Sequence, residues 1–245
     1  MINQIKDLLR PLKHRVRVLL GKDMMFKSEL EVTSEFHGTE YGGFAILKKS
    51  LNKDSVILSC GIGEDASFDM ALIEKYGCVI HAFDPTPKSI AWVKATISDP
   101  HFVFHEYAVA DTDGSIRLYL PKRADYVSAS LQPGWHTSDD FVDVVSRRLS
   151  TIVKELGLDK IDVLKMDIEG AEYIVLQDYL TDPDNPLPDQ LALEFHHFYP
   201  EFGLQATKEA INLIKSRGYR LCWVSRSHHE LLFVRSHLLK AQLTN

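Results

Sequence analysis

Acidic and imidazole side chains follow two apolar runs near the middle of the chain. Asp167 and Glu169 come directly after one run, and Glu194 and His196 close the next one. Both runs read as strands, and residues two apart on a strand share a face, so we expect Glu194 and His196 to project together. Such groups can take a proton from a hydroxyl, which is worth about 10²–10⁴-fold in rate. The pattern therefore predicts a general base.

The same groups also suit a divalent cation. Carboxylates with a histidine can hold Mg²⁺ or Mn²⁺, which acidifies a bound hydroxyl, and Asp167, Glu194 and His196 are the candidate ligands. Lys165 either neutralises these acids or orients an acceptor. Glu169 can also serve only to complement the dipole of the helix that follows it. Metal-free and metal-assisted deprotonation both remain open.

A glycine-rich turn supplies the second chemical feature. The apolar run Val56-Ile-Leu58 predicts a buried strand, followed by Gly61, Gly63 and a helical pattern from about Ala66. Glycines there let backbone N–H groups approach a ligand, with the helix N-terminus behind them. Asp84 ends the next strand and could accept both ribose hydroxyls of an adenosine. The spacing predicts a nucleotide-binding βαβ unit.

Two observations separate the candidate nucleotides, NAD and S-adenosylmethionine. Glu64 and Asp65 stand at the helix N-terminus, where they would repel a diphosphate but can accept from the amino group of a methionine. The strands expected at 219–224 and 230–235 are joined by so few residues that they must be antiparallel. One reversed pair beside parallel strands is typical of methyltransferase sheets. Both observations favour S-adenosylmethionine, although the two acids can also serve only the helix dipole.

Four sequence blocks carry a family resemblance. They are Cys60-Gly-Ile-Gly-Glu-Asp65, His81-Ala-Phe-Asp-Pro-Thr-Pro87, Ala108-Val-Ala-Asp111 and, most distinctively, Ile161-Asp-Val-Leu-Lys-Met-Asp-Ile-Glu-Gly-Ala-Glu172. With them, residues 38–235 resemble the FkbM-type methyltransferases. The family more often has Asp-x-Gly-Ala-Asn at the first turn and Glu-Pro after the second strand. The Ser59-Cys-Gly-Ile-Gly63 and Asp84-Pro85 found here indicate a sub-branch.

The resemblance implies the roles of the site residues. Gly61 and Gly63 would approach S-adenosylmethionine, Asp84 would hold its ribose, and Ala108 and Val109 would flank its adenine. The full set expected at the cofactor adds Cys60, Glu64 and Asp167. The resemblance also implies methylation of a hydroxyl on a small molecule, sugar or glycan. An NAD-dependent oxidoreductase and a non-catalytic nucleotide-binding scaffold are the alternatives.

Strands alternate with helical stretches along the chain, which predicts an α/β fold. We expect a class I, Rossmann-like methyltransferase: a mainly parallel seven-stranded sheet with an antiparallel closing hairpin and helices on both faces. Residues 1–34 would form a basic amphipathic helical extension, and residues 35–245 the S-adenosylmethionine-binding domain. Within this domain we expect a strand at 102–109 and a helix at 146–156.

Two segments are expected to shape the acceptor pocket. The glycine-rich loop 35–44 places Tyr41 as a candidate lid residue, although its glycines can simply turn the chain. Residues 121–142 show no clear periodicity, and a long irregular segment is often functional. This segment offers Ser128, Ser130 and His136 as candidate acceptor contacts.

The N-terminal segment differs in charge from the rest of the chain. Apolar residues recur at helical spacing over 2–20, broken at Pro11, and residues 1–22 carry six basic side chains against Asp7. The helix could lie on an anionic membrane, but packing on its own domain or on a sister subunit in a homo-oligomer is favoured. The net charge of −6 gives no general attraction to nucleic acid. Isolated cysteines and the lack of a spanning run predict a cytoplasmic protein, either free or membrane-associated.

Overall fold

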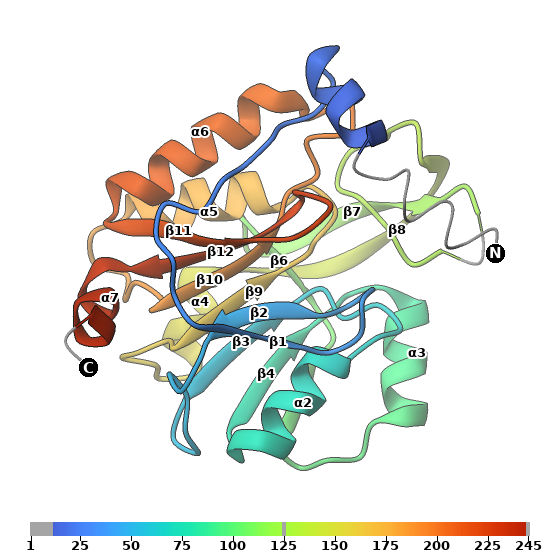
Figure 1. Cartoon of the computed structure of the whole chain (residues 1–245). Helices are drawn as coiled ribbons and strands as arrows, with labels where there is room; N and C mark the ends of the chain where they lie inside the picture. The colour runs from blue at the N-terminus through green and yellow to red at the C-terminus, as the bar shows by residue number, and fades with distance from the viewer. Residues whose placement is uncertain (1–11, 124–125, 244–245) are drawn as a thin grey trace, which may run out of the picture.

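A seven-stranded sheet forms the centre of the computed structural model, which describes residues 12–123 and 126–243 (Figure 1). The strand order is β11-β12-β10-β9-β3-β4-β5. The bounds are β3 (Val56–Cys60), β4 (Val79–Phe83), β5 (Phe102–His105), β9 (Val163–Met166), β10 (Gln190–Glu194), β11 (Tyr219–Val224) and β12 (Glu230–Arg235). Neighbouring strands are parallel except that β12 runs antiparallel to both β10 and β11. The expected α/β fold is confirmed, with the reversed strand inside the sheet rather than at its edge.

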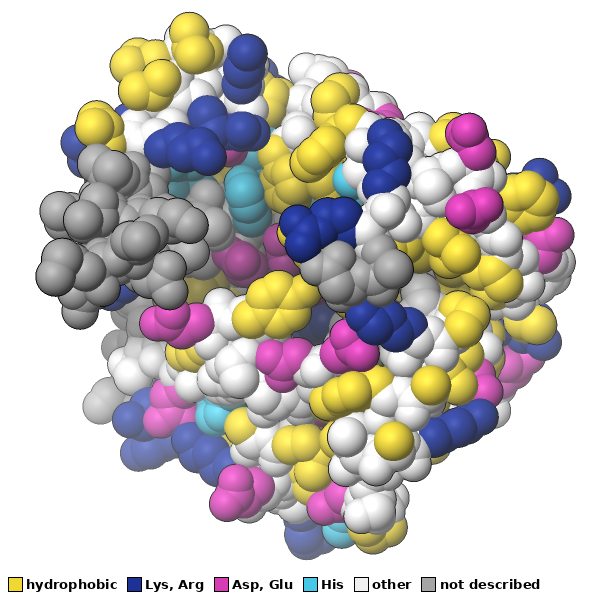
Figure 2. Space-filling model, turned by 90° about the vertical axis from the view of Figure 1, so that its right-hand side faces the viewer, with side chains coloured by type: hydrophobic (Ala, Val, Ile, Leu, Met, Phe, Trp, Pro, Cys, Tyr) yellow, Lys and Arg dark blue, Asp and Glu magenta, His cyan; other side chains and the backbone are white. Residues whose placement is uncertain are grey.

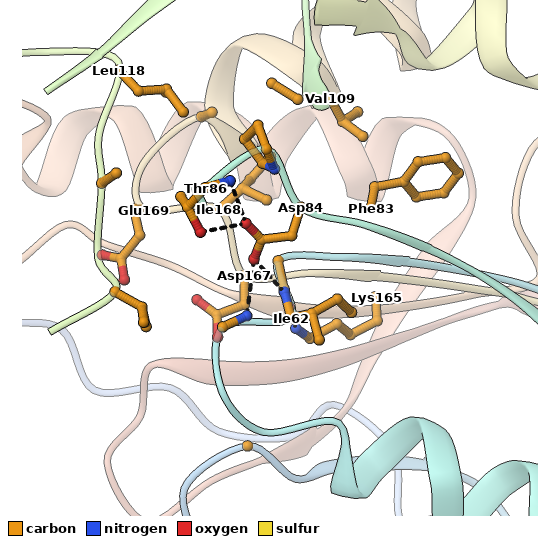
Figure 3. A pocket seen from close by; sticks show the side chains of 18 of the residues that line it. Ile62, Phe83, Asp84, Thr86, Val109, Leu118, Lys165, Asp167, Ile168 and Glu169 are labelled. Carbon is orange, nitrogen blue, oxygen red and sulfur yellow. Dashed lines mark hydrogen bonds between the residues drawn. The ribbon is translucent and has the colours of Figure 1, made fainter. Parts of the chain in front are cut away.

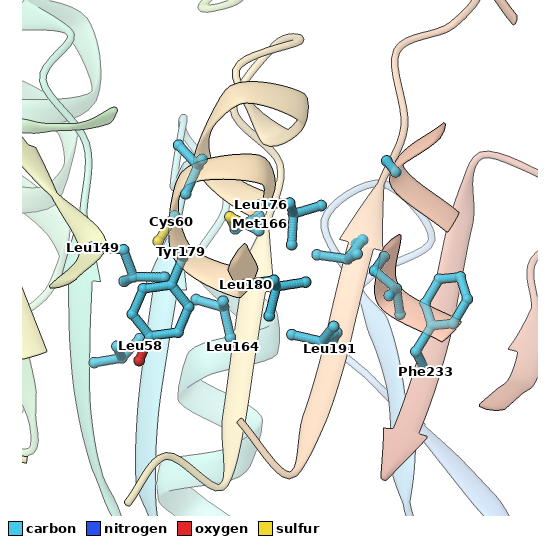
Figure 4. Close-up of a cluster of buried hydrophobic side chains, with 14 of the residues drawn as sticks. Leu58, Cys60, Leu149, Leu164, Met166, Leu176, Tyr179, Leu180, Leu191 and Phe233 are labelled. Atoms are coloured by element: carbon cyan, nitrogen blue, oxygen red, sulfur yellow. The ribbon is translucent and has the colours of Figure 1, made fainter. Parts of the chain in front are cut away.

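Helices cover both faces of this sheet (Figure 1). They are α2 (Ser67–Tyr76), α3 (Pro87–Thr96), α4 (Leu149–Glu155), α5 (Glu172–Thr181), α6 (Gly203–Ser216) and α7 (Ser236–Leu243). One buried cluster joins α4, α5 and α6 to the sheet, and a second joins α2 and α3 to the opposite face. Figure 4 shows Leu176 and Leu180 of α5 packing over Leu164 and Leu191. Because both faces are covered, the central strands are almost continuously apolar.

Two smaller sheets change the expected boundaries. β6 (Ala108–Ala110), β7 (Gly114–Pro121) and β8 (Thr137–Arg148) form a three-stranded sheet, while β1 (Ser34–His37) and β2 (Phe44–Leu47) form a hairpin. The single strand expected at 102–109 is therefore wrong, because it is divided between β5 and β6 in different sheets. The helix expected from residue 146 begins at Leu149, and residues 137–142 are not irregular. Much of β8 is exposed, so this strand is stabilised by its pairing with β7 rather than by burial of its side chains.

The N-terminal helix is described over residues 12–19, and the expected break at Pro11 lies outside the described residues. Its apolar side chains Leu12, Val16 and Leu19 are 61%, 46% and 85% exposed. The favoured packing of this face on its own domain therefore does not occur for these residues. The chain beyond them is attached to the sheet, because Glu29 N–H donates to the Leu221 carbonyl at 2.7 Å. Within the described residues, every helix is too short or too polar to cross a bilayer.

Candidate active site

The glycine turn after β3 is packed directly against the end of β9. Gly61 has a φ of +83°, and a Cβ there would lie 1.7 Å from the Asp167 carbonyl oxygen. Gly61 N–H donates to the Phe83 carbonyl at 2.9 Å, and Asp167 N–H donates to the Cys60 carbonyl at 3.0 Å. These bonds hold the carboxyl ends of three neighbouring strands together. Only a residue without a side chain fits this conformation and this contact.

A pocket opens at these strand ends, where ligands bind in open α/β sheets (Figure 3). It holds about 840 Å³ of empty space, part of it solvent. The apolar walls include Phe83, Val109, Leu118 and Ile168, and carboxylates come from Asp65, Asp84, Asp167 and Glu169. An aromatic ring system and cationic groups could therefore both be accommodated.

Asp84 makes four hydrogen bonds within the protein (Figure 3). Its Oδ2 accepts from the N–H groups of Ile62 and Gly63, each at 2.9 Å. Its Oδ1 accepts from the N–H and the hydroxyl of Thr86, at 2.9 and 2.7 Å. A carboxylate has about four acceptor positions. Asp84 therefore orders the glycine turn here, and a ribose hydroxyl would replace one of these donors.

The other residues expected at the cofactor divide into two groups. Gly61, Gly63, Ala108, Val109 and Asp167 line the pocket. Two others are not among its lining residues: Cys60 is buried in the core, where burial raises the pKa of its thiol to about 12, and Glu64 is exposed and 3.0 Å from Lys88.

Of the two neighbouring acids that precede α2, it is Asp65 that lines the pocket. It accepts from the Thr39 hydroxyl at 2.6 Å and from the Ser67 N–H at 2.8 Å. These bonds connect the loop that carries Tyr41 to the start of α2. The set expected at the cofactor from sequence contained Glu64 and not Asp65, whereas Asp65 is the one that lines the pocket.

His196 lies at the centre of an acidic cluster beside the pocket. Its Nε2 is 3.6 Å from Asp167 Oδ1 and 3.5 Å from Glu169 Oε2, and its Nδ1 is 3.2 Å from Glu172 Oε1. Burial alone would lower the pKa of the imidazole. The surrounding carboxylates of Glu172, Glu169 and Glu194 outweigh burial and raise its pKa well above the usual value. The structure thus favours a protonated His196 among acids.

The neighbouring carboxyls have raised pKa values. Burial raises the pKa of Asp167 to about 6, against the opposing charges of Lys165 and His196. Burial and the Asp167 charge raise the pKa of Glu194 well above its usual value. A carboxylate with a raised pKa is a stronger base than usual, and it still ionises near neutral pH if its pKa is close to 6. Asp167 has this property and also lines the pocket.

Glu172 and Tyr199 complete the cluster and were not identified as functional from sequence. Glu172 is fully buried and accepts from the N–H groups of Ile168 and Gly170, at 2.7 and 3.0 Å. Tyr199 donates its hydroxyl to Glu169 Oε2 at 2.7 Å. In the sequence, Glu172 is an acid in the first turn of a helix, a position that the helix dipole alone would explain. No local signal identifies Tyr199, which comes from the loop after β10.

Lys165 points toward the glycine turn. Its ammonium group donates to the Gly61 carbonyl and lies 3.4 Å from the Cys60 carbonyl, over the Phe44 ring. Lys165 also lowers the pKa of Asp167 through its charge. This placement favours neutralisation of the acids over direct orientation of an acceptor.

The expected acceptor residues lie around the same opening. Tyr41 lines the pocket and is 79% exposed. Ser130 is buried and donates to the Glu169 carbonyl at 3.0 Å, while His136 stacks on Tyr199 with ring centroids 4.0 Å apart. Of the four expected acceptor residues only Tyr41 lines the pocket; Ser128, Ser130 and His136 do not, although both neighbours of Ser128 do. Figure 2 shows a hollow on this face with acidic and histidine side chains inside it.

Comparison with known proteins identifies the family. Residues 57–221 match the sequence model of the methyltransferase FkbM domain. The chain belongs to this family. This FkbM domain is 27% identical to the human "probable methyltransferase-like protein 24" over 69% of the chain and 40% of the relative. It is 30% identical to the 2-O-methyltransferase NoeI of Sinorhizobium fredii, over 50% of the chain and 56% of the relative. The chain thus spans well under two thirds of these relatives.

Solved structures with similar folds are more distant. Fibrillarin from Methanococcus jannaschii aligns over 75% of this FkbM domain and 67% of its own chain, with 10% identity and a TM-score of 0.45. Fibrillarin from Aeropyrum pernix aligns over 77% and 68%, with 9% identity and a TM-score of 0.43.

Proposed function

We propose that this FkbM domain transfers a methyl group from S-adenosylmethionine to a hydroxyl. One observation carries the proposal: Asp167 and Glu169 both line the pocket and both lie within 3.6 Å of His196. The ligand pocket and the groups able to take a proton therefore meet. The residues also fit the cofactor, because apolar walls suit an adenine and carboxylates suit the positive sulfonium and ammonium groups.

In the proposed reaction S-adenosylmethionine supplies an activated methyl, and the protein supplies alignment and a base. Asp167 takes the proton of the acceptor hydroxyl, since it faces the pocket and has a raised pKa. The positive charge of His196 partly neutralises the surrounding carboxylates. Glu172 places its carboxylate 3.2 Å from the other ring nitrogen of His196, and Tyr199 donates its hydroxyl to the Glu169 carboxylate.

A sugar hydroxyl is the acceptor class that we favour. Trp135 is 62% exposed, and its ring lies 6.2 Å from that of Tyr199, which bonds Glu169. A sugar presents apolar ring faces and hydroxyls together, and an exposed aromatic beside acids can contact both. The name of the relative NoeI, a 2-O-methyltransferase, supports an oxygen as the methyl acceptor.

The acceptor is tested by following S-adenosylhomocysteine release with methyl hexosides and their 2-deoxy counterparts. Methylated product from the 2-hydroxy sugars alone supports transfer to O2. Equal product from both would exclude that position. Asp167→Ala and His196→Ala should each lower turnover by about 10²-fold or more. Full activity in both variants would overturn the assignment of the base cluster.

A metal-assisted reaction is the second candidate. Asp167, Glu169 and His196 each offer one ligand atom, and these atoms lie within 4.8 Å of one another. Glu194, expected as a ligand from sequence, is not in this set. Mg²⁺ or Mn²⁺ held there would acidify a hydroxyl. Turnover that is unchanged after chelation would exclude the metal-assisted reaction. Turnover that is lost on chelation and restored by Mg²⁺ or Mn²⁺ would exclude the metal-free reaction.

We further propose that the helix of residues 12–19 contacts an anionic membrane surface. Its exposed Leu12, Val16 and Leu19 stand beside Lys13 and Arg15, a combination that suits the headgroup region. A cytoplasmic protein bound to the inner membrane face would fit this surface. Covering of the same face by a second copy is the alternative, and it would make the protein a homo-oligomer.

A further inference from the structure

Three side chains from distant segments converge outside the proposed catalytic cluster. Asp23 follows the N-terminal helix, His197 follows β10, and His229 lies in the turn between β11 and β12. One carboxylate oxygen and one nitrogen from each ring lie within 4.8 Å of one another. Asp23 Oδ1 is 2.9 Å from His197 Nε2 and 3.7 Å from His229 Nε2. Asp23 and His197 are buried and His229 is partly buried.

Hydrogen bonds within the described part of the chain do not satisfy this arrangement. His229 Nε2 is buried without a hydrogen-bond partner there, and 3.7 Å is too long for such a bond. His14 Nε2 lies 3.6 Å from the same oxygen of Asp23, but its hydrogen bond is with the Met24 carbonyl, at 3.0 Å. Asp23 Oδ1 accepts from the Met24 N–H and is paired with His197 Nε2, each at 2.9 Å, so hydrogen bonding does not account for the nearby His229 nitrogen.

A bound metal ion would explain the spacing. Ligand atoms at 2.0–2.1 Å from a tetrahedral zinc ion lie roughly 3.3 Å apart. The two distances from Asp23 Oδ1 lie on either side of that value. We propose that Asp23, His197 and His229 bind a dication of the zinc class. Imidazole and carboxylate ligands suit zinc and its transition-metal neighbours.

The surroundings hold the carboxylate in a suitable orientation. Arg17 Nε donates to Asp23 Oδ2 and the Met24 N–H donates to Oδ1, both at 2.9 Å, and these two bonds fix the carboxylate with Oδ1 beside His197. Such outer contacts are the usual means of orienting metal ligands. His14 is held by stacking on His228, with ring centroids 4.5 Å apart.

The proposed site would tie the N-terminal helix to the strand ends that carry His196, the neighbour of His197. It does not depend on the proposed methyl transfer. A metal that binds the folded state alone stabilises it according to its concentration and affinity. Zinc at 100 times its dissociation constant should raise the Tm of the metal-free full chain by about 5–10 °C.

The experiment measures metal content and Co²⁺ absorption spectra of the full chain after chelation, dialysis and reloading. We expect one equivalent of Zn²⁺, and a tetrahedral d–d spectrum with Co²⁺ that Zn²⁺ abolishes. His229→Gln should weaken Co²⁺ binding at least tenfold, whereas His237→Gln, a control at an exposed histidine, should not. Circular dichroism verifies that each variant is folded.

A second pair of variants separates the two clusters. Asp167→Asn and His196→Gln remove groups of the catalytic cluster and should leave the Co²⁺ spectrum unchanged. Loss of the spectrum in these variants, with retention in His229→Gln, would overturn the proposal. So would failure of the wild-type chain to bind one equivalent of either metal.

Discussion

The Nδ1 of His196 lies 3.2 Å from Oε1 of Glu172, and both side chains are buried. Glu172 is in turn fixed by the backbone N–H groups of Ile168 and Gly170. The same ring presents its Nε2 to Asp167 and Glu169. A single buried carboxylate thus connects the turn after β9 to the histidine that follows β10.

Glu172→Gln tests this connection. The amide keeps the shape but removes the charge that orients His196 and raises its pKa, so we expect kcat to fall by about 10–100-fold. Affinity for S-adenosylhomocysteine should stay within a few-fold, because Glu172 does not line the pocket. Steady-state kinetics and calorimetric titration provide the two measurements. The exposed Glu209, changed to Gln, is the matched control. Equal kcat in both variants would show that the contact has no role in positioning.

The contact of Gly61 with Asp167 predicts a specific steric effect. Gly61→Ala should lower the free energy of unfolding by about 2–4 kcal/mol, because a clash adds to the cost of a positive φ. Gly157→Ala is the control, since Gly157 also has a positive φ, +62°, but nothing lies within 4 Å of its Cβ position. We expect about 1–2 kcal/mol there. Denaturant unfolding compares the two variants. Equal losses of unfolding free energy in the two variants would mean that the clash at Gly61 is relieved without cost.

The stability of the sheet should depend on His105. Burial and the neighbouring His81 lower the pKa of His105 to about 4, below the usual value near 6.5. The unfolded chain therefore binds the proton more readily, so stability is full above about pH 6.5 and is lost as the pH falls toward 4. His105→Gln should remove up to about 3 kcal/mol of that pH dependence. The measurement is unfolding at pH 7 and pH 4.5, with exposed His101→Gln as control. An unchanged pH dependence in His105→Gln would contradict the prediction.

Liposome sedimentation tests the proposed membrane contact. The full chain should sediment with vesicles containing anionic phospholipid and should remain in solution with neutral ones. Leu19→Glu should reduce the bound fraction severalfold, because Leu19 is 85% exposed. Leu30→Glu, at a 38% exposed position outside the helix, is the control. Binding of both variants at the wild-type level would exclude this surface. A dimer in light scattering that Leu19→Glu dissociates would favour the second-copy alternative.

The cofactor side of the site could be predicted because its signals are local. β3, the glycine turn, α2 and β4 follow one another within residues 56–83, and Gly61, Gly63 and Asp84 belong to that unit or directly follow it. The antiparallel direction of β12 could also be predicted, because the short connection from β11 permits only that direction. The detailed bonding of Asp84 to the turn was not predictable from residue types.

The catalytic cluster was predicted in part. Asp167, Glu169 and His196 were expected together because the carboxyl ends of neighbouring parallel strands share an edge. Glu172 and Tyr199 contact this set through a helix start and an irregular loop, for which residue spacing gives no direction. The sheet of β6, β7 and β8 was missed for a related reason. β7 and β8 are half-exposed and the buried β6 has only three residues, so their pairing is not visible as an apolar run.

Calorimetric titration of the full chain with S-adenosylhomocysteine and with NAD⁺ tests the central claim most directly. The pocket places carboxylates where a diphosphate would be repelled, and we expect one equivalent of S-adenosylhomocysteine to bind. NAD⁺ should give no measurable heat at the same concentrations. Binding of NAD⁺, with no response to S-adenosylhomocysteine, would contradict the proposed function.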